Sequence, residues 1–421
     1  MELLYRFVNP WWEGKDFITG VTREDYVGPI TSRLWHEESE VLIGGLGVGK
    51  TTILKQIIKH LLTSGTPAAA ILYLPLHYPG LSSLSLTENL LKVQTQLIRN
   101  RKRIRYLLVD EIQEEPGWER EIKKACFSEL SKIFAAATVA PPVRGRGRQA
   151  TTRIETTVYP LTFREFMRFR DYDFAGCSSE RYVELAEDYL QTGGYPAQVI
   201  DPASETLTRI IEVAPVQIVG PFYQVRKSHR LRDFLTALAC TIGTRTSYRR
   251  LAEELRLSIG TIKDYLGHLE ESWLIKRVER WSSVTAERTY APKKFYLGDN
   301  GLQTILTGDM VMAGRAENAV FLELWRKGVP CGYDGEGTAE VDFVLGPRSR
   351  PVIIDVRYDP SPGDGDGRYE GVRSFIHRFP RTRAAIVITR DGEDAFKIGR
   401  TEARAMPLWK ALTTEEMFTS L

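Results

Sequence analysis

The stretch EVLIGGLGVGKTTILKQIIKHLL, residues 40–62, decides the fold. Its apolar start, residues 41–43, is typical of a short buried strand. Residues 44–51 then match the pattern G-x-x-x-x-G-K-[ST] in full. Apolar side chains recur afterwards at helical spacing, at Ile53, Ile57, Ile58 and Leu61. A strand, a glycine-rich loop and a helix in this order predict a phosphate-binding loop (P-loop) at one end of a parallel sheet.

The chemistry of phosphate binding explains these residue types. Glycines let the backbone curl so that its N–H groups surround the phosphates of ATP, and the following helix presents the positive end of its dipole. We expect Lys50 to reach the β- and γ-phosphates and Thr51 to give its hydroxyl to Mg²⁺. The residues expected around the nucleotide are Gly44, Gly45, Leu46, Gly47, Val48, Gly49, Lys50, Thr51 and Thr52.

A second strand-like run, residues 104–109, ends in Asp110 and Glu111. An acid at the end of a neighbouring parallel strand is suited to hold Mg²⁺ through water, so Asp110 is the second expected metal residue. A glutamate directly after it favours activation of an attacking water, and hence hydrolysis of the nucleotide. The alternative for Glu111 is a surface residue that opens a loop. Another strand, residues 70–75, and a helix, residues 86–98, lie between the two motifs, as in a parallel sheet covered on both faces.

Four further motifs accompany the P-loop: NPWW at 9–12, VDEIQEEPGWE at 109–119, YPLTFREF at 159–166 and GGYP at 193–196. In this order they resemble the archaeal and bacterial AAA-type ATPases that carry a winged helix and a restriction-endonuclease-like C-terminal domain. The resemblance covers nearly the whole chain. It implies an AAA-type, Mg²⁺-dependent ATPase domain.

The chain departs from that family in two places. The family often has an Arg-Arg pair inside the P-loop, where this chain has Leu46 and Gly47. The family usually has a polar sensor turn after the next strand, where this chain has residues 133–140, with Thr138 as the candidate sensor of the γ-phosphate. The weak sensor region argues against efficient, tightly coupled hydrolysis.

The segment VRGRGRQATTR, residues 143–153, allows three interpretations. An arginine finger, from the same chain or a neighbouring subunit, would stabilise charge at the phosphates, and Arg153 is our candidate. The glycine-spaced Arg144, Arg146 and Arg148 would instead contact nucleic-acid phosphates. The third interpretation is a flexible, solvated loop.

The middle of the chain changes to a helical pattern. Residues 171–225 predict a small helical lid. Residues 226–290 predict three helices, the third capped by Ser258, and then a strand at 274–278, which together indicate a winged helix-turn-helix. Lys and Arg outnumber Asp and Glu between 226 and 256, which favours DNA over the alternative, a winged helix used for protein packing. The candidate DNA contacts here are Arg245, Arg249, Arg250, Thr261 and Lys263.

The last part, residues 291–421, resembles the PD-(D/E)xK nuclease core. Glu317 is expected on a helix, Asp342 on a strand at 340–345, and Asp355 with Arg357 on a strand at 352–357. The three carboxylates would hold Mg²⁺, but Arg357 stands where a lysine would activate water, and arginine stays protonated. Two interpretations follow: an active nuclease, or a retained nuclease fold that binds DNA or protein without cutting.

Composition excludes several other classes of protein. With 57 basic and 54 acidic residues in 421, the net charge of +3 excludes a polycation that coats nucleic acid by charge alone. The four cysteines are far apart in sequence, which disfavours a zinc site or a disulfide framework. The start shows no signal-peptide pattern, and prolines interrupt the longest uncharged run. We therefore expect a cytoplasmic protein with no membrane segment.

These inferences combine into one hypothesis of an α/β architecture. It has a P-loop ATPase domain at 1–170, a helical lid at 171–225, a winged helix-turn-helix at 226–290 and an α/β nuclease-like domain at 291–421. The expected function is hydrolysis of ATP with Mg²⁺, coupled to DNA binding or remodelling by the C-terminal half. One alternative is a slow ATP switch that acts on a protein partner or an operator, and another is an ATP-regulated DNA nuclease. An arginine finger acting in trans would further require a homo-oligomer.

Overall fold

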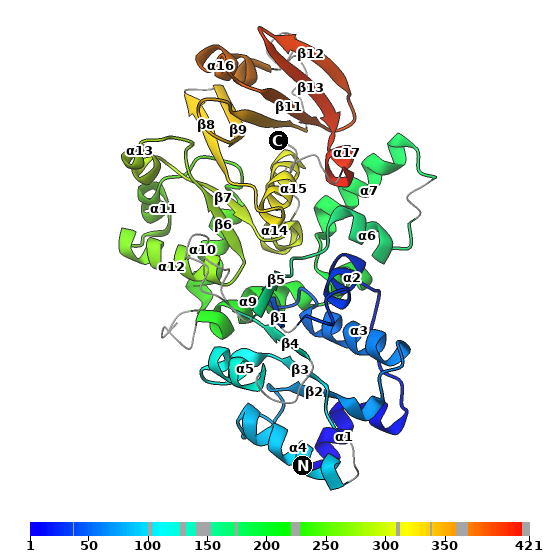
Figure 1. Cartoon of the computed structure of the whole chain (residues 1–421). Helices are drawn as coiled ribbons and strands as arrows, with labels where there is room; N and C mark the ends of the chain where they lie inside the picture. Colours follow the sequence, from blue (N-terminus) through cyan, green and yellow to red (C-terminus); the bar gives the residue numbers. More distant parts are fainter. Residues whose placement is uncertain are drawn as a thin grey trace. The chain divides into compact units, whose positions relative to one another are not determined.

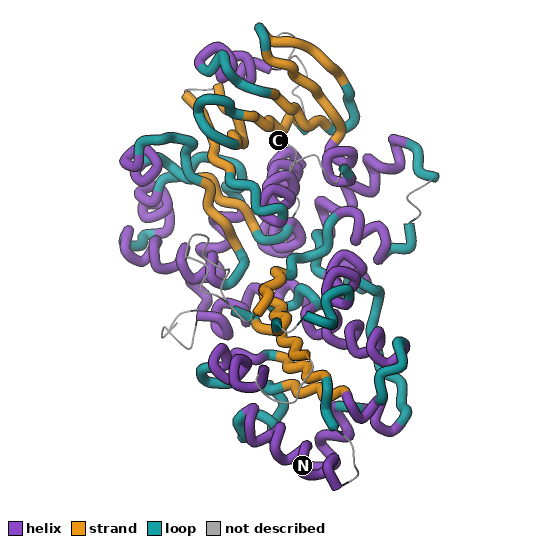
Figure 2. The backbone as a smooth tube through the Cα atoms, in the orientation of Figure 1, coloured by secondary structure: helices purple, strands orange, loops and turns teal. Residues whose placement is uncertain are grey.

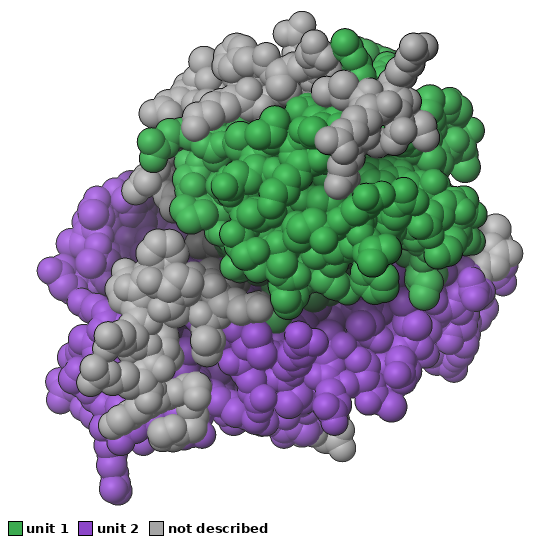
Figure 3. All heavy atoms as spheres, turned by 90° about the horizontal axis from the view of Figure 1, so that it is seen from below, with its two compact units in different colours: residues 1–159 green, residues 160–421 purple. Residues whose placement is uncertain are grey.

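The computed structural model describes residues 1–36, 38–99, 103–126, 132–139, 153–172, 176–219, 228–308, 312–336, 339–358 and 369–414. The chain forms two compact units, Met1–Tyr159 and Pro160–Leu421 (Figure 3). Arg144, Arg146 and Arg148 lie outside the described residues. Within the described part of the chain, no helix is long and apolar enough to cross a bilayer.

Unit 1 is built on a five-stranded sheet of order β2-β3-β4-β1-β5, in which every neighbouring pair is parallel (Figure 1). Its strands are β1 (Ser39–Ile43), β2 (Ile71–Pro75), β3 (Tyr106–Asp110), β4 (Lys132–Ala137) and β5 (Arg153–Thr157). The side chains of β1, β2 and β4 are buried throughout, as expected for strands covered on both faces. The predicted parallel α/β sheet is therefore confirmed.

Helices and short 3-10 turns precede and connect these strands (Figure 2). They are α1 (Glu2–Val8), η1 (Pro10–Glu13), α2 (Glu24–Thr31), α3 (Lys50–Thr63), η2 (Ala68–Ala70), α4 (Leu86–Arg99), η3 (Ile112–Glu114) and α5 (Trp118–Cys126). Helix α3 begins directly after Gly49, whose φ of 96° lies in the left-handed region that glycine tolerates. Its apolar residues Ile53, Ile57 and Ile58 are fully buried, so the helix is anchored along the face that the sequence pattern predicted.

The NPWW motif covers β2, which is an edge strand of the sheet. The Asn9 side chain accepts from Tyr73 N at 2.7 Å and donates to Tyr73 O at 3.1 Å, so that it pairs with the strand as another backbone would. The indole nitrogens of Trp11 and Trp12 both donate to Ile71 O, at 3.3 and 2.8 Å. These hydrogen bonds pair backbone groups at an edge of the sheet that would otherwise lack partners, which explains the local role of the motif.

Asn9→Ala should therefore lower the free energy of unfolding of unit 1 by about 2–4 kcal/mol, because it leaves the buried N–H and C=O of Tyr73 unpaired. Chemical denaturation followed by tryptophan fluorescence measures this change. Glu13→Ala, a substitution in the adjacent turn η1, is the control and should have little effect. Equal stability of Asn9→Ala and wild type would contradict the role assigned to this side chain.

Unit 2 begins with helices. They are α6 (Phe163–Phe169), α7 (Ser179–Thr192), α8 (Pro196–Ile200), α9 (Thr206–Val219), α10 (Ser228–Ala239), α11 (Tyr248–Leu255) and α12 (Ile259–Glu271). The YPLTFREF motif starts α6 with a capping box between Thr162 and Glu165. The Ser258 side chain accepts from Thr261 N, so the predicted N-cap of α12 is confirmed. The strand expected next is β6 (Ile275–Val278), which pairs antiparallel with β7 (Lys294–Leu297).

The rest of unit 2 surrounds a six-stranded sheet of order β12-β13-β11-β10-β9-β8. Its strands are β8 (Cys331–Glu336), β9 (Ala339–Leu345), β10 (Val352–Arg357), β11 (Ala384–Thr389), β12 (Asp394–Ile398) and β13 (Thr401–Pro407). The accompanying helices are α13 (Thr285–Tyr290), α14 (Asn300–Thr307), α15 (Met312–Arg326), α16 (Glu370–Arg378) and α17 (Leu408–Thr413). Val372, Phe375 and Ile376 of α16 form an apolar core with residues of the sheet that include Ile353 and Val387. The strands expected at 340–345 and 352–357 are confirmed.

Candidate functional site

The P-loop joins the carboxyl end of β1 to helix α3. Lys50 Nζ donates to Gly44 O at 3.0 Å and to Gly45 O at 2.7 Å, and the side chain is buried. Burial lowers the pKa of Lys50 to about 8, although Glu111 and Asp110 act in the opposite direction. The ammonium is therefore held inside the loop at an energetic cost, with two backbone carbonyls in place of phosphate oxygens.

Thr51 and Asp110 meet beside this lysine. Thr51 Oγ1 donates to Asp110 Oδ2 at 2.7 Å, and Tyr73 OH donates to the same oxygen at 2.8 Å. Asp110 is completely buried, and this burial raises its pKa. A threonine hydroxyl next to a carboxylate supplies the oxygen ligands that Mg²⁺ prefers, so these residues fit the expected metal. Tyr73 was missed by the sequence analysis, because only pairing of β2 with β3 brings it to Asp110.

Glu111 follows Asp110 with a left-handed φ of 52°. Its Oε1 accepts from Thr138 Oγ1 at 3.1 Å, and its Oε2 accepts from Gln113 Nε2. Gln113 Oε1 in turn accepts from Thr138 N at 3.0 Å. Since Thr138 directly follows β4, which lies between β3 and β1, the sheet order brings the expected sensor to the expected base. Gln113 was missed, although the DEIQ motif contains it.

A buried arginine supports the P-loop from outside the motif. Arg23 Nη1 donates to Val48 O at 2.8 Å and to Tyr159 O at 3.0 Å, and its guanidinium lies 4.5 Å from the centre of the Tyr26 ring. Position 44 of the P-loop requires glycine, because a Cβ at Gly44 would lie 2.4 Å from Val158 O. No sequence pattern near Arg23 marks it as part of the site.

Arg153 lies elsewhere in unit 1. It pairs with Ser39 at the amino end of β1, whereas the P-loop follows the carboxyl end of that strand. Its guanidinium forms ion pairs with Glu155 at 2.7 Å and Glu119 at 3.1 Å. Within one chain, Arg153 therefore lies at the opposite end of the sheet from Lys50 and Thr51. The prediction that Arg153 is an arginine finger acting in cis is wrong, because the strand direction places it away from the P-loop. A finger in trans stays a prediction.

Unit 2 contains an acidic cluster. The structure brings together Glu317 of α15, Asp342 of β9, and Asp355 and Arg357 of β10, as the sequence analysis expected. Burial and Asp342 raise the pKa of Glu317, to about 7, and burial raises that of Asp355 well above its ordinary value. Arg357 forms an ion pair with Asp355 at 2.9 Å.

Lys294 of β7 also belongs to this cluster and was missed. Its Nζ lies 2.9 Å from Glu317 Oε1, 2.8 Å from Asp342 Oδ1 and 2.5 Å from Glu340 Oε1. Among the residues that the structure describes, no group of three or more His, Cys, Asp or Glu side chains is arranged to hold a metal ion. The Mg²⁺ that a nuclease core implies therefore does not fit this cluster as it stands.

The expected DNA contacts near α11 and α12 are mostly engaged in ion pairs. Arg249 pairs with Glu253 at 2.9 Å and Arg250 with Glu254 at 2.8 Å, each one helical turn away on α11. Arg245 pairs with Glu340 at 2.9 Å. Thr261 Oγ1 is 2.9 Å from Ser258 Oγ in the helix cap, whereas Lys263 is exposed on α12. Each of the three arginines therefore has a carboxylate partner within the protein.

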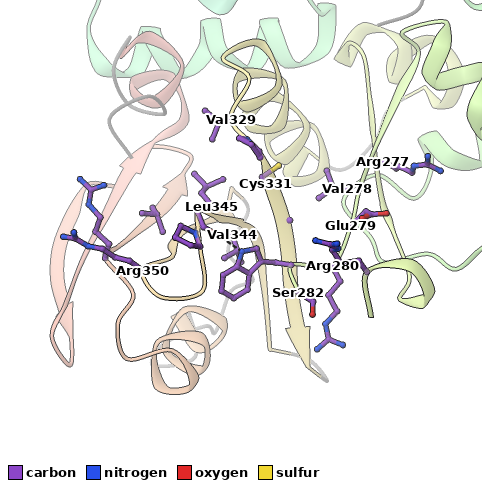
Figure 4. Close-up of a pocket in the computed structure, with 18 residues that line it drawn as sticks. Arg277, Val278, Glu279, Arg280, Ser282, Val329, Cys331, Val344, Leu345 and Arg350 are labelled. Atoms are coloured by element: carbon purple, nitrogen blue, oxygen red, sulfur yellow. Dashed lines mark hydrogen bonds between the residues drawn. The ribbon is translucent and has the colours of Figure 1, made fainter. Parts of the chain in front are cut away.

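A pocket of about 800 Å³ in unit 2 is more basic (Figure 4). Its arginines are Arg277, Arg280, Arg288, Arg350 and Arg383, and Glu279 is the acidic residue among its lining side chains. Arg277 and Arg280 lie on one side of the pocket and Arg350 on the other (Figure 4). Arg277, Arg280 and Arg288 are close in sequence, but Arg350 and Arg383 come from distant segments, so no local charge pattern could have identified the whole pocket.

Comparisons with known proteins identify two regions of the chain. Residues 37–167 match the model of the "AAA domain" family, and residues 183–310 match a "Domain of unknown function (DUF8612)". An uncharacterized protein of Haemophilus influenzae is 25% identical, covering 80% of this chain and 87% of its own. Uncharacterized protein MJ1544 of Methanocaldococcus jannaschii is 23% identical, covering 77% of this chain and 76% of its own.

The similar solved structures are more distant. DnaA of Aquifex aeolicus bound to AMPPCP has a TM-score of 0.28 at 12% identity, covering 60% of this chain and 89% of its own. The R170A variant of the Thermotoga maritima RuvB has a TM-score of 0.32 at 16% identity, covering 62% of this chain and 92% of its own. Scores this low do not bear on function. Residues 37–167 thus match the AAA domain family and fold as a parallel α/β sheet with a P-loop.

Proposed function

We propose that the chain hydrolyses ATP with Mg²⁺ in unit 1. The observation that carries this proposal is the convergence of Lys50, Thr51, Asp110, Glu111 and Thr138 at the carboxyl ends of β1, β3 and β4. Thr51 and Asp110 would hold Mg²⁺, which would neutralise phosphate charge. Lys50 would exchange its two carbonyl partners for phosphate oxygens, and Glu111 would accept the proton of the attacking water.

The hydrogen bonds of Glu111 bear on how fast this ATPase would turn over. Thr138 and Gln113 each donate to one oxygen of the Glu111 carboxylate, so the base shares its lone pairs with two protein donors when it contacts water. A carboxylate that shares its lone pairs is a weaker base, which supports slow turnover, as in the switch alternative. One measurement separates DNA-coupled hydrolysis from the slow switch. It compares steady-state ATP hydrolysis by the full chain without DNA and with duplex, single-stranded or forked DNA. Stimulation of several fold by one DNA form supports coupling to DNA, whereas indifference to every form supports the switch.

We further propose that DNA binds unit 2 at the arginine-lined pocket of Figure 4. Five arginines with one acidic residue suit a phosphate backbone, and guanidinium groups bind phosphate oxygens in a bidentate manner. Ion pairs occur at both surfaces, since Arg277 of the pocket pairs with Glu270 at 3.4 Å. The α11 face is the weaker candidate because each of its two arginines, Arg249 and Arg250, has its own glutamate partner. The winged-helix interpretation places DNA on that face and remains the alternative.

Arg288→Ala combined with Arg350→Ala should weaken DNA binding and reduce the slope of log K against log salt by about 2, since two phosphate contacts are lost. Fluorescence anisotropy over a salt series measures both quantities. The matched control is Arg249→Ala with Arg250→Ala, which removes the same charge from α11. A larger effect of the control pair would move the interface to the winged helix, and no effect of either pair would contradict DNA binding by these surfaces.

A further inference from the structure

Lys294 is enclosed by the acidic cluster of unit 2. An ammonium group has three N–H donors, and Lys294 Nζ lies within 2.5–2.9 Å of three carboxylates, those of Glu317, Glu340 and Asp342. The side chain is completely buried. The three donors are therefore engaged, and none faces water or an incoming ligand.

Other groups of unit 2 also contact the carboxylates of Glu317 and Asp342. Tyr296, two residues along β7 and so on the same face of the strand, donates to Glu317 Oε1 at 2.6 Å. The loop at Gly243 covers the second oxygen of Glu317, because a Cβ there would lie 2.3 Å from Oε2. Asp342 Oδ2 accepts from Val356 N at 2.9 Å. The oxygens of Glu317 and Asp342 thus already have a protein partner or a backbone neighbour, whereas the buried oxygens of Asp355 accept no hydrogen bond and face the charge of Arg357 at 2.9 Å.

A divalent ion and Lys294 exclude each other at this position. Mg²⁺ binds carboxylate oxygens at about 2.0–2.1 Å, so an ion held by Glu317 and Asp342 would lie almost in contact with the ammonium that bridges them. Two like charges at that separation in a buried site repel strongly. The alternative is that Lys294 replaces the water-activating lysine which Arg357 cannot provide. That role requires a neutral amine whose lone pair faces water, whereas the Lys294 ammonium faces three carboxylates.

We propose that the ammonium of Lys294 takes the place of the divalent cation in this cluster. The cluster then serves as a cation-filled core that joins β7 to α15 and β9, and it does not cleave nucleic acid. The inference concerns unit 2 and is independent of the proposed ATPase function. It also predicts a latent site: removal of the one internal cation should leave three converging carboxylates able to bind a divalent metal.

The test uses Lys294→Met in the full chain without nucleotide. The variant removes the charge and keeps much of the side-chain volume. We expect it to unfold at a lower temperature than wild type, to bind Mn²⁺ at least tenfold more tightly, and to regain about 5 °C at saturating Mn²⁺. Wild type should show no such stabilisation. Calorimetric Mn²⁺ titration and thermal unfolding measure these quantities.

Two control variants assign the effect to the cluster. Lys293→Met changes the neighbouring lysine, which pairs with Glu279 at 3.7 Å, and should gain no Mn²⁺ site. Asp342→Asn added to Lys294→Met should remove the gained site. Because P-loop residues are unchanged in every variant, ATP hydrolysis reports separately on the proposed function of unit 1.

Wild-type protein supplies a test that does not depend on how the variants fold. DNA incubated with wild type and Mg²⁺ or Mn²⁺ should remain intact. Wild type and Asp342→Asn should bind Mn²⁺ equally, because Asp342 holds no metal ion in wild type. If wild type cleaves DNA and Lys294→Met does not, the proposal is overturned and Lys294 is a catalytic residue. Tight Mn²⁺ binding by wild type at Asp342 would overturn it as well.

Discussion

Glu111→Gln should lower the rate of ATP hydrolysis by about 10²- to 10⁴-fold, the range expected when a general base is lost. The amide has the shape of the carboxylate but cannot accept a proton from water. Its oxygen can still accept the hydrogen bond from Thr138 Oγ1, which lies 3.1 Å from Glu111 Oε1. Nucleotide binding should stay within about threefold of wild type, because the P-loop contacts of Lys50 are unchanged. Steady-state phosphate release and a fluorescent-nucleotide titration measure the two effects.

Glu114→Gln is the matched control, because it makes the same chemical change at an exposed residue of the adjacent turn η3. It should hydrolyse ATP like wild type. Turnover of Glu111→Gln within threefold of wild type would exclude Glu111 as the base. It would favour the alternative from the sequence, a surface residue that opens a loop.

The nucleotide site could be predicted largely from sequence because its parts are local. Gly44, Lys50 and Thr51 lie within one motif, and Asp110 ends β3 with Glu111 directly after it, so motif spacing and strand direction place them. Thr138 could be proposed because it follows the next strand. The structure added the hydrogen bonds that link it to Glu111.

The remaining contacts depend on packing between segments that no local pattern links. Arg23 reaches Val48 O only because α2 packs beside the P-loop. Lys294 was visible in the sequence as part of a lysine pair, yet its role follows from β7 lying against α15. The prediction of Arg153 as an arginine finger in cis was wrong for the same reason. Its position along the chain does not determine the end of the sheet at which it lies.

Lys50→Ala should abolish ATP hydrolysis and weaken nucleotide binding by about tenfold to hundredfold, because a charge-assisted contact with the phosphates is lost. Lys50→Arg should also bind poorly, since a planar guanidinium does not fit the buried position of a compact ammonium. The exposed Lys59, on the same helix and paired with Asp16 at 3.1 Å, supplies the control variant Lys59→Ala, which should bind nucleotide normally.

The stability of the nucleotide-free protein gives this prediction a second readout. Burial lowers the pKa of Lys50 to about 8, which means that the folded protein bears a cost for holding the ammonium without phosphate. Lys50→Ala should therefore unfold at the same or a higher temperature than wild type when nucleotide is absent. Wild type should be stabilised by ATP with Mg²⁺ and the variant should not, because only wild type can exchange its two carbonyl partners for phosphate oxygens. A variant that loses stability without nucleotide, yet still gains it from ATP, would show that Lys50 supports the fold of the loop instead of binding phosphate.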